Sequence, residues 1–321
     1  MTDAQDDGRV ADATDANWVD RLAPKRTRPY LRLSRADRPA GTWLLLIPCW
    51  WGIALAAAAT GQIIAAVWPA LGCAIGAFLM RGAGCTWNDI TDRHIDAQVA
   101  RTRSRPIPSG QVTPKKAAIW MIIQALLAFG ILLTFNTTAI ALGILSLAPV
   151  AIYPFAKRFT WWPQIFLGLA FNWGAILGWA AVTGSLSAAP FLLYLAGIIW
   201  TLFYDTIYAH QDREDDALIG VKSTARLFAQ NTPTWLLGFL IASVTLLTLA
   251  TILALTSQSN PIALIAALAS VWGFGWHLAW QLRKLDINDP EICMHLFRSN
   301  RDAGLIIAAG FAVAALISIA I

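Results

Sequence analysis

The chain has 321 residues, of which 57% are hydrophobic and only 13% are charged. Ordinary soluble domains carry about a quarter charged residues, so this composition argues against a soluble domain and predicts an integral membrane protein. The four cysteines have no paired spacing, which argues against a disulfide framework or a zinc site.

The first part of the chain differs from the rest. It is rich in Asp, Ala and Arg and shows little periodicity, so we expect residues 1–28 to form a disordered tail and residues 29–321 to form one membrane domain. The first apolar run begins only near Gly41, after this polar leader, which is too late for a cleavable signal peptide. We therefore expect the first membrane helix to be retained.

Nine apolar segments are long enough to cross a bilayer, which takes ~20 mostly apolar residues per helix. They are 41–60, 63–86, 114–135, 137–155, 162–182, 188–209, 234–256, 262–282 and 302–321. The fourth segment carries Pro149 and Pro154 and has the weakest pattern. The sequence predicts an all-α integral membrane protein, a bundle of nine transmembrane helices.

The charged residues all fall on one side of this nine-helix arrangement. All 24 Lys and Arg residues and all 19 Asp and Glu residues lie in the tail, at the connections on that side or in the segment ends next to them. Because cationic connections remain in the cytoplasm, we expect a cytoplasmic N-terminus and a C-terminus on the opposite side. This topology predicts a multi-pass protein of the cell inner membrane.

The first cluster of acids continues the second apolar segment. Asp89, Asp92 and Asp96 are spaced at i, i+3 and i+7, so a helix that runs through them carries all three on one stripe. Asn88 lies beside Asp92 at i+4. A charged loop leaving the membrane would explain this cluster if it stood alone.

A second cluster of acids follows the sixth apolar segment. Asp205, Asp212 and Asp216 are spaced at i, i+7 and i+11 and also share one stripe of a continuous helix. Glu214 and Asp215 project elsewhere and are interpreted as solvated. Two such clusters on the same side of the membrane favour a functional site over two charged loops.

Carboxylates crowded at a membrane boundary repel one another and are costly to desolvate, so a cation should hold them together. A hard divalent cation takes oxygen ligands, with phosphate as a natural co-ligand. Most loop cations merely set topology or meet lipid headgroups, but a bound diphosphate also needs Arg or Lys. The best-placed cations, each near a helix end or a motif, are Arg38, Arg105, Arg158 and Lys222. The clusters therefore predict a Mg²⁺-dependent enzyme that acts on a diphosphate.

Four stretches carry a resemblance to a known family. They read NDITDRHID from residue 88, YDTIYAHQDREDD from residue 204, DRPAG from residue 37 and YPFAKRFTWWPQ from residue 153. The two acid-rich stretches resemble the motifs of the UbiA family of intramembrane prenyltransferases. The others, together with the second motif, are similar to the branch that prenylates 4-hydroxybenzoate. The resemblance covers almost everything after about residue 28.

This resemblance implies a nine-helix bundle around a cytoplasm-facing cavity that holds Mg²⁺ and a polyprenyl diphosphate. It implies transfer of the prenyl group to 4-hydroxybenzoate, ortho to the phenol, with release of diphosphate, in ubiquinone biosynthesis. The lipid bilayer and these two substrates are the expected partners, with no nucleic acid and no obligate protein partner.

The resemblance also implies roles for single residues. The expected metal ligands are Asn88, Asp92 and Asp96, with Asp89 supporting them, and Asp212 and Asp216 of the second motif. Asp205 or Asp212 is expected to assist removal of the ring proton. Arg38, Arg105 and Lys222 are expected to bind the diphosphate, and Arg158 the benzoate carboxylate.

Two other functions deserve comparison. Acids in a membrane also mark ion pathways, but transport sites lie near the bilayer midplane, where these segments carry no charge. A structural scaffold would have no use for two acid stripes. Within the family, the remaining alternative is a different aromatic acceptor, because acceptor choice depends on the shape of the pocket.

Overall fold

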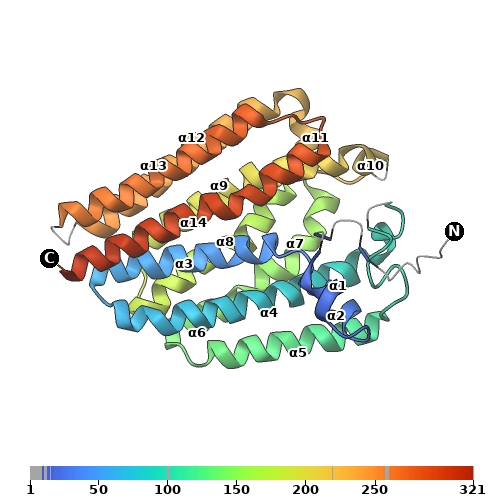
Figure 1. The fold of residues 1–321 in the computed structure, drawn as a ribbon, viewed down its shortest axis with the longest axis horizontal. Helices are drawn as coiled ribbons and strands as arrows, with labels where there is room; N and C mark the ends of the chain where they lie inside the picture. Colours follow the sequence, from blue (N-terminus) through green and yellow to red (C-terminus); the bar gives the residue numbers. More distant parts are fainter. Residues whose placement is uncertain are drawn as a thin grey trace. The chain divides into compact units, whose positions relative to one another are not determined.

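The structure, a computed structural model, describes residues 9–10, 13–14, 16–99, 102–218, 220–256 and 260–320, without the side chains of residues 212 and 214–216. Within these ranges the regular elements are all helical, and no strand occurs. Figure 1 shows these helices in chain order. The predicted all-α class is therefore confirmed for the part of the chain that is described.

Nine helical segments of the described chain are long and apolar enough to cross a membrane, as the sequence predicts. They are α3 (Ala40–Thr60), α4 (Ile63–Asp96), α5 (Pro114–Leu132), α6 with α7 (Thr137–Leu145 and Leu147–Phe159), α8 (Pro163–Thr183), α9 (Ala188–Ala209), α11 with η2 and α12 (Thr224–Phe228, Ala229–Asn231 and Thr232–Leu255), α13 (Pro261–Lys284) and α14 (Pro290–Ala320).

The fourth span is broken where its prolines predict weakness. Helix α6 ends at Leu145 and α7 begins at Leu147, with Ser146 between them. Pro149 lies in the first turn of α7. It lacks an N–H, and its ring would clash with the carbonyl of residue 145 in a continuous helix. A break at Ser146 removes this clash, while Pro154 is accommodated inside α7.

The chain forms two compact units. The first consists of residues 1–42 and 75–131, and the second of residues 43–74 and 132–321. The first unit begins with the short helices α1 (Trp18–Leu22) and α2 (Arg28–Leu33). Asn17 caps α1 by accepting a hydrogen bond from the Asp20 N–H at 3.0 Å. Helix α1 thus lies inside the range expected to be a disordered tail, whose boundary at residue 28 stays a prediction.

The core of the first unit joins α2, α5 and the segment between α4 and α5. Its buried residues are Leu33, Ile107, Val112 and Ala117. Nearby, α4 comes very close to its neighbours at Gly82, where an added Cβ would lie 2.0 Å from Gln124 Oε1 and 2.9 Å from Ser34 Oγ. A side chain at this position would have to displace Gln124, which accepts a hydrogen bond from Ser34.

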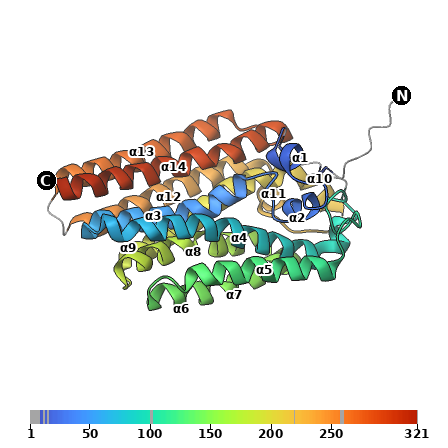
Figure 2. The same cartoon turned by 60° about the horizontal axis from the view of Figure 1, so that its bottom comes forward.

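The second unit is organised around α9, which packs against α8, α12 and α14, while α13 packs against α12 and α14. Figure 2 shows α13 and α14 lying side by side. Its centre is aromatic: Trp51 stacks on Trp200 at 5.0 Å between ring centroids, and Phe274 meets both rings edge-on. The fully buried Trp200 side chain fixes the helix that leads into the second acid motif.

Candidate active site

The first acid motif lies on one continuous helix. Helix α4 is 34 residues long and runs without a break to Asp96, so Asp89, Asp92 and Asp96 share a stripe as the spacing predicts. All three are buried, with exposed fractions of 0%, 0% and 5%. Asn88 is half-buried. Burial of three carboxylates on one helix face requires compensating positive charge.

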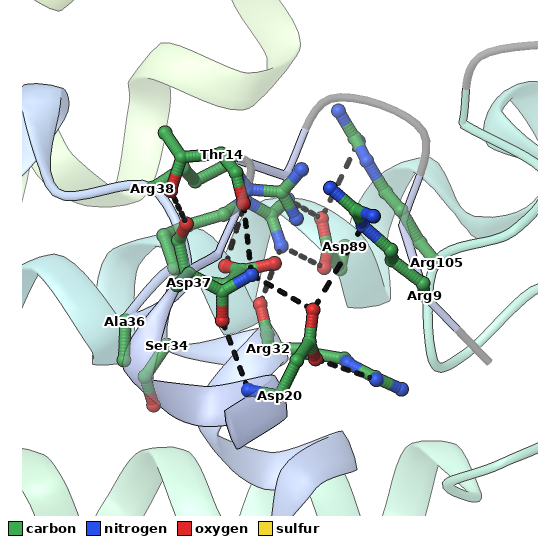
Figure 3. A network of polar contacts seen from close by, with 12 residues as sticks. Arg9, Thr14, Asp20, Arg32, Ser34, Ala36, Asp37, Arg38, Asp89 and Arg105 are labelled. Carbon is green, nitrogen blue, oxygen red and sulfur yellow. Dashed lines mark hydrogen bonds and ion pairs between the residues drawn. The ribbon is translucent and has the colours of Figure 1, made fainter. Parts of the chain in front are cut away.

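Arginines supply that charge around Asp89. Arg35 binds it at two points: Nη1 donates to Oδ2 at 2.9 Å and Nη2 to Oδ1 at 2.6 Å. Arg105 Nη1 approaches Oδ1 at 3.4 Å. Figure 3 shows Asp89 within this polar network, with Arg105 beside it. Asp89 therefore accepts hydrogen bonds from two arginines, and its expected supporting role toward the metal stays a prediction.

Arg105, expected to bind diphosphate, also holds the end of the acid helix. Its Nη1 donates to Asp96 Oδ2 at 2.9 Å, so one guanidinium bridges Asp89 and Asp96. The Thr102 hydroxyl donates to the Asp96 carbonyl at 2.8 Å. These bonds fold the segment after α4 back onto its last turn. The expected role of Arg105 toward diphosphate stays a prediction.

Arg38 lies next to a second buried carboxylate. Its Nε is 3.5 Å from Asp37 Oδ1, and Figure 3 shows the two residues adjacent. Neither carboxylate oxygen of Asp37 has a hydrogen-bond partner in the described structure. Burial raises the pKa of Asp37 to about 6, although the charge of Arg35 acts in the opposite direction. Burial disfavours the charge of Arg35 itself, but the Asp89 carboxylate outweighs it and the pKa of Arg35 is raised.

Sequence reasoning missed Arg35. Its neighbour Arg38 was selected because it lies next to the first transmembrane helix, whereas the structure makes Arg35 the principal partner of Asp89. One signal was present in the sequence: a cluster of buried acids needs cations, and the segment before α3 is rich in arginine. Spacing alone does not show which arginine turns inward.

The donor set of the first motif fits a hard divalent cation. Asn88, Asp92 and Asp96 offer amide and carboxylate oxygens on neighbouring turns of α4, as Mg²⁺ prefers. Asp92 in particular presents a fully buried carboxylate. Among the described residues, no three His, Cys, Asp or Glu side chains converge as a ready metal site.

The predicted stripe of the second motif assumed one continuous α-helix. This assumption is wrong, because the α-helix is interrupted within the motif. Helix α9 ends at Ala209, a 3₁₀ turn η1 (His210–Asp212) follows, and α10 (Arg213–Leu218) continues from it. A 3₁₀ turn rotates successive residues further than an α-helix does, so the i, i+7, i+11 alignment is shifted. Asp205 is half-buried on the last turns of α9. The side chains of Asp212 and Asp216 lie outside the described residues.

Hydrogen bonds fix the surroundings of this motif. The Thr206 and Thr224 hydroxyls lie 2.6 Å apart, which ties α9 to the start of α11. His210 Nε2 lies 3.1 Å from the Thr232 hydroxyl. Burial lowers the pKa of His210 to about 4, so the imidazole is neutral at physiological pH.

The structure brings the two basic segments of the second unit together. The Lys222 N–H donates to the Lys157 carbonyl at 3.3 Å, and Lys222 Nζ to the Phe159 carbonyl at 3.4 Å. Arg158 lies over the Phe155 ring at 5.2 Å. Lys222, expected to bind diphosphate, and Arg158, expected to bind the benzoate carboxylate, thus lie on neighbouring segments. Their ligands stay predictions.

The nine candidate spans and the buried, oxygen-rich acid motif define a multi-pass helical membrane protein with a charged site. The model of the UbiA prenyltransferase family matches residues 45–301, so the chain belongs to this family.

Relatives and solved structures agree with this assignment. The chain is 50% identical over 290 residues to the mitochondrial 4-hydroxybenzoate polyprenyltransferase of Bos taurus, covering 90% of this chain and 76% of the relative. It is 48% identical over 305 residues to that of Homo sapiens, covering 94% and 79%. A UbiA homolog from Archaeoglobus fulgidus bound to GPP and Mg²⁺ has a TM-score of 0.69 at 18% identity, covering 91% of this chain and 100% of that one. The latter likeness supports the fold.

Proposed function

We propose that this protein is a 4-hydroxybenzoate polyprenyltransferase, which transfers a polyprenyl group from polyprenyl diphosphate to the carbon ortho to the phenol and releases diphosphate. One observation carries the proposal: about half of the residues are identical to enzymes of that name over nine-tenths of the chain. The reaction would supply a precursor of ubiquinone.

Mg²⁺ would bind the diphosphate and stabilise the negative charge that grows on it as the carbon–oxygen bond breaks. Asn88, Asp92 and Asp96 are our proposed ligands in the first motif, and Asp212 and Asp216 in the second. The UbiA homolog solved with GPP and Mg²⁺ supports this use of a divalent metal.

The chain's own residues have defined tasks in this proposal. Arg38, Arg105 and Lys222 neutralise diphosphate oxygens, and Arg158 binds the acceptor carboxylate. Bond cleavage leaves a cation-like allylic carbon, which the electron-rich ring attacks. Asp205 or Asp212 then accepts the proton from that ring carbon, which restores aromaticity. Apolar helices keep water away from the allylic cation.

The membrane placement is also part of the proposal. All formal charges lie at one side of the nine spans, which supports a cytoplasmic N-terminus and active site in the cell inner membrane, with the C-terminus opposite. We further propose that residues 29–321 form the membrane prenyltransferase domain and that residues 1–28 are a tail outside it.

The test is a panel of donors and acceptors. Membranes that contain the protein are incubated with Mg²⁺, polyprenyl diphosphates of several lengths and several phenolic acids, and product masses are measured. We expect prenylated 4-hydroxybenzoate as the main product. A panel in which another phenolic acid is the main prenylated product would contradict the assignment of the acceptor.

A further inference from the structure

We propose that Arg35 is a positioning residue: its two-point ion pair with Asp89 fixes the acid-bearing end of α4 and thereby presents Asn88, Asp92 and Asp96 as metal ligands. The inference rests on the proposed function, because it concerns the metal that the reaction would use. Arg35 contributes no ligand itself.

The geometry of the pair is that of a fork holding a carboxylate. Both Nη atoms of Arg35 donate, each to a different oxygen of Asp89, at 2.9 and 2.6 Å. The side chains are 7% and 0% exposed. A two-point contact fixes the rotation of the carboxylate as well as its position, which a lysine would not do. Asp89 follows Asn88 in the chain and lies about one turn before Asp92 on α4, so fixing it restrains both neighbours.

The backbone of Arg35 forms the turn that ends α2. Its φ is +57°, in the left-handed region that residues with a Cβ rarely adopt. Such a conformation costs energy and persists only where surrounding contacts enforce it. The next residue, Ala36, donates its N–H to the Leu31 carbonyl at 3.0 Å, and this hydrogen bond closes α2. The Arg35 N–H also donates to the Arg32 carbonyl at 3.1 Å, so this turn is a common helix-ending motif that places Arg35 just beyond the end of α2.

Ser34, the residue before Arg35, is anchored to α5 and lies against α4. The Ser34 hydroxyl donates to Gln124 Oε1 at 2.8 Å, and Trp120 Nε1 donates to the Ser34 oxygen at 2.9 Å. Gly82 of α4 lies directly against this pair. The end of α2 is therefore fixed to α5 and to α4 about two turns before Asp89. Arg35 consequently reaches Asp89 from a rigid base.

Arg105 extends the effect to the end of the motif. It bridges Asp89 and Asp96 through Nη1, at 3.4 and 2.9 Å. As long as Arg35 occupies both oxygens of Asp89, Arg105 is left with one longer contact there and one short contact at Asp96. Without Arg35, we expect Arg105 to move onto Asp89 and to pull away from Asp96. The loss of one arginine would thus disturb the ligands at both ends of the stripe.

The test measures metal binding directly. Mn²⁺, an oxygen-preferring probe ion with an electron paramagnetic resonance signal, is titrated into the purified full-length protein in detergent, together with measurements of unfolding temperature and prenyl transfer. For Arg35→Met we expect Mn²⁺ to bind at least tenfold more weakly, the usual effect of losing a group that orients metal ligands. Arg26→Met is the matched control, because Arg26 is an exposed arginine of the same segment; it should bind Mn²⁺ as the wild type does.

Two more variants separate positioning from folding. Arg35→Met with Asp89→Leu removes both buried charges, so we expect it to recover the unfolding temperature while Mn²⁺ binding stays at least tenfold weaker. Arg35→Lys keeps the charge without the fork and should fold but still bind Mn²⁺ more weakly. Wild-type Mn²⁺ affinity in the double variant or in Arg35→Lys would overturn the inference. A wild-type protein that binds no Mn²⁺ and transfers no prenyl group would instead overturn the proposed function, and this inference with it.

Discussion

Arg35 and Asp89, 54 residues apart in the chain, meet in a buried two-point ion pair with nitrogen–oxygen distances of 2.9 and 2.6 Å. The pair links the segment before the first transmembrane helix to the end of the second. Because neither charge reaches water, each depends on the other for compensation. Two distant parts of the sequence therefore build the first acid motif, and the spacing of its acids does not reveal the contribution of Arg35.

Asp89→Asn should destabilise the protein strongly. The substitution keeps the size of the side chain but leaves Arg35 as a buried charge without its carboxylate, which costs about 3–5 kcal/mol when a buried pair is broken. Thermal unfolding in detergent measures the effect. Asp302→Asn is the control: Asp302 binds Arg301 at 2.7 Å, but the two side chains are 53% and 49% exposed, so its loss should cost about 1 kcal/mol or less. Equal effects of the two variants would contradict the burial argument.

Asp37 should make the stability of the protein depend on pH. Burial raises its pKa from an ordinary 3.8 to about 6 in the folded protein, so between these values the folded state binds more protons than the unfolded state. Asp37 therefore favours the folded state fully below about pH 4, and this contribution to stability is lost as the pH rises through about 6. The charges of Arg35 and Arg32 lower the pKa of Asp37 and the charge of Asp20 raises it, but burial has the largest effect.

The measurement is the difference in unfolding temperature between wild type and Asp37→Asn across pH 4–7. Asp37→Asn should become the more stable of the two as pH rises. The difference is needed because His210, with its pKa lowered to about 4, gives stability the opposite dependence in the same window. A difference that does not change with pH would rule out the raised pKa of Asp37.

Gly52→Ala should weaken the packing of α3 against α8. An added Cβ would lie 2.1 Å from the Ala175 carbonyl oxygen, and backbone cannot move aside as a flexible side chain can. We expect a loss of about 1–3 kcal/mol. Gly76→Ala is the matched control in α4, where a Cβ would meet none of the described atoms within 4 Å; it should be neutral or stabilising by up to about 1 kcal/mol.

Asn300→Leu should loosen the centre of the second unit. Asn300 accepts a hydrogen bond from Trp200 Nε1 at 2.9 Å and exchanges two more with the Gln281 amide, at 3.0 and 3.2 Å. Leucine leaves these buried groups without partners, a cost of about 1–3 kcal/mol each. Ser299→Ala, which removes only a local bond to the Leu296 carbonyl, should have little effect. Similar unfolding temperatures for both variants would refute the role of the amide pair.

Much of the fold could be predicted from the sequence because its signals are local. Runs of ~20 apolar residues mark the spans, and the i, i+3, i+7 spacing of Asp89, Asp92 and Asp96 requires only that α4 continue, which it does. The 3₁₀ turn at His210–Asp212 was not predictable in this way, because tertiary contacts around Thr206 and Thr232 hold it in place.

The partners within the site were harder to predict. Every loop arginine has the same charge, and which one turns inward depends on the backbone: Arg35 adopts φ +57° and reaches Asp89, whereas Arg38 lies against Asp37. The expected supporting role of Asp89 toward the metal stays a prediction. Sequence spacing identifies the acids, and three-dimensional packing determines which of them bind arginine.

The central claim is that the chain transfers a prenyl group to 4-hydroxybenzoate through a metal held by the first acid motif. The most direct test measures 3-prenyl-4-hydroxybenzoate formed by purified wild type and Asp92→Ala, each with Mg²⁺ and with a chelator. We predict product only from wild type with Mg²⁺, while Asp92→Ala inserts into membranes normally and is inactive. Product from Asp92→Ala at near wild-type rate, or from wild type in the presence of the chelator, would contradict the claim.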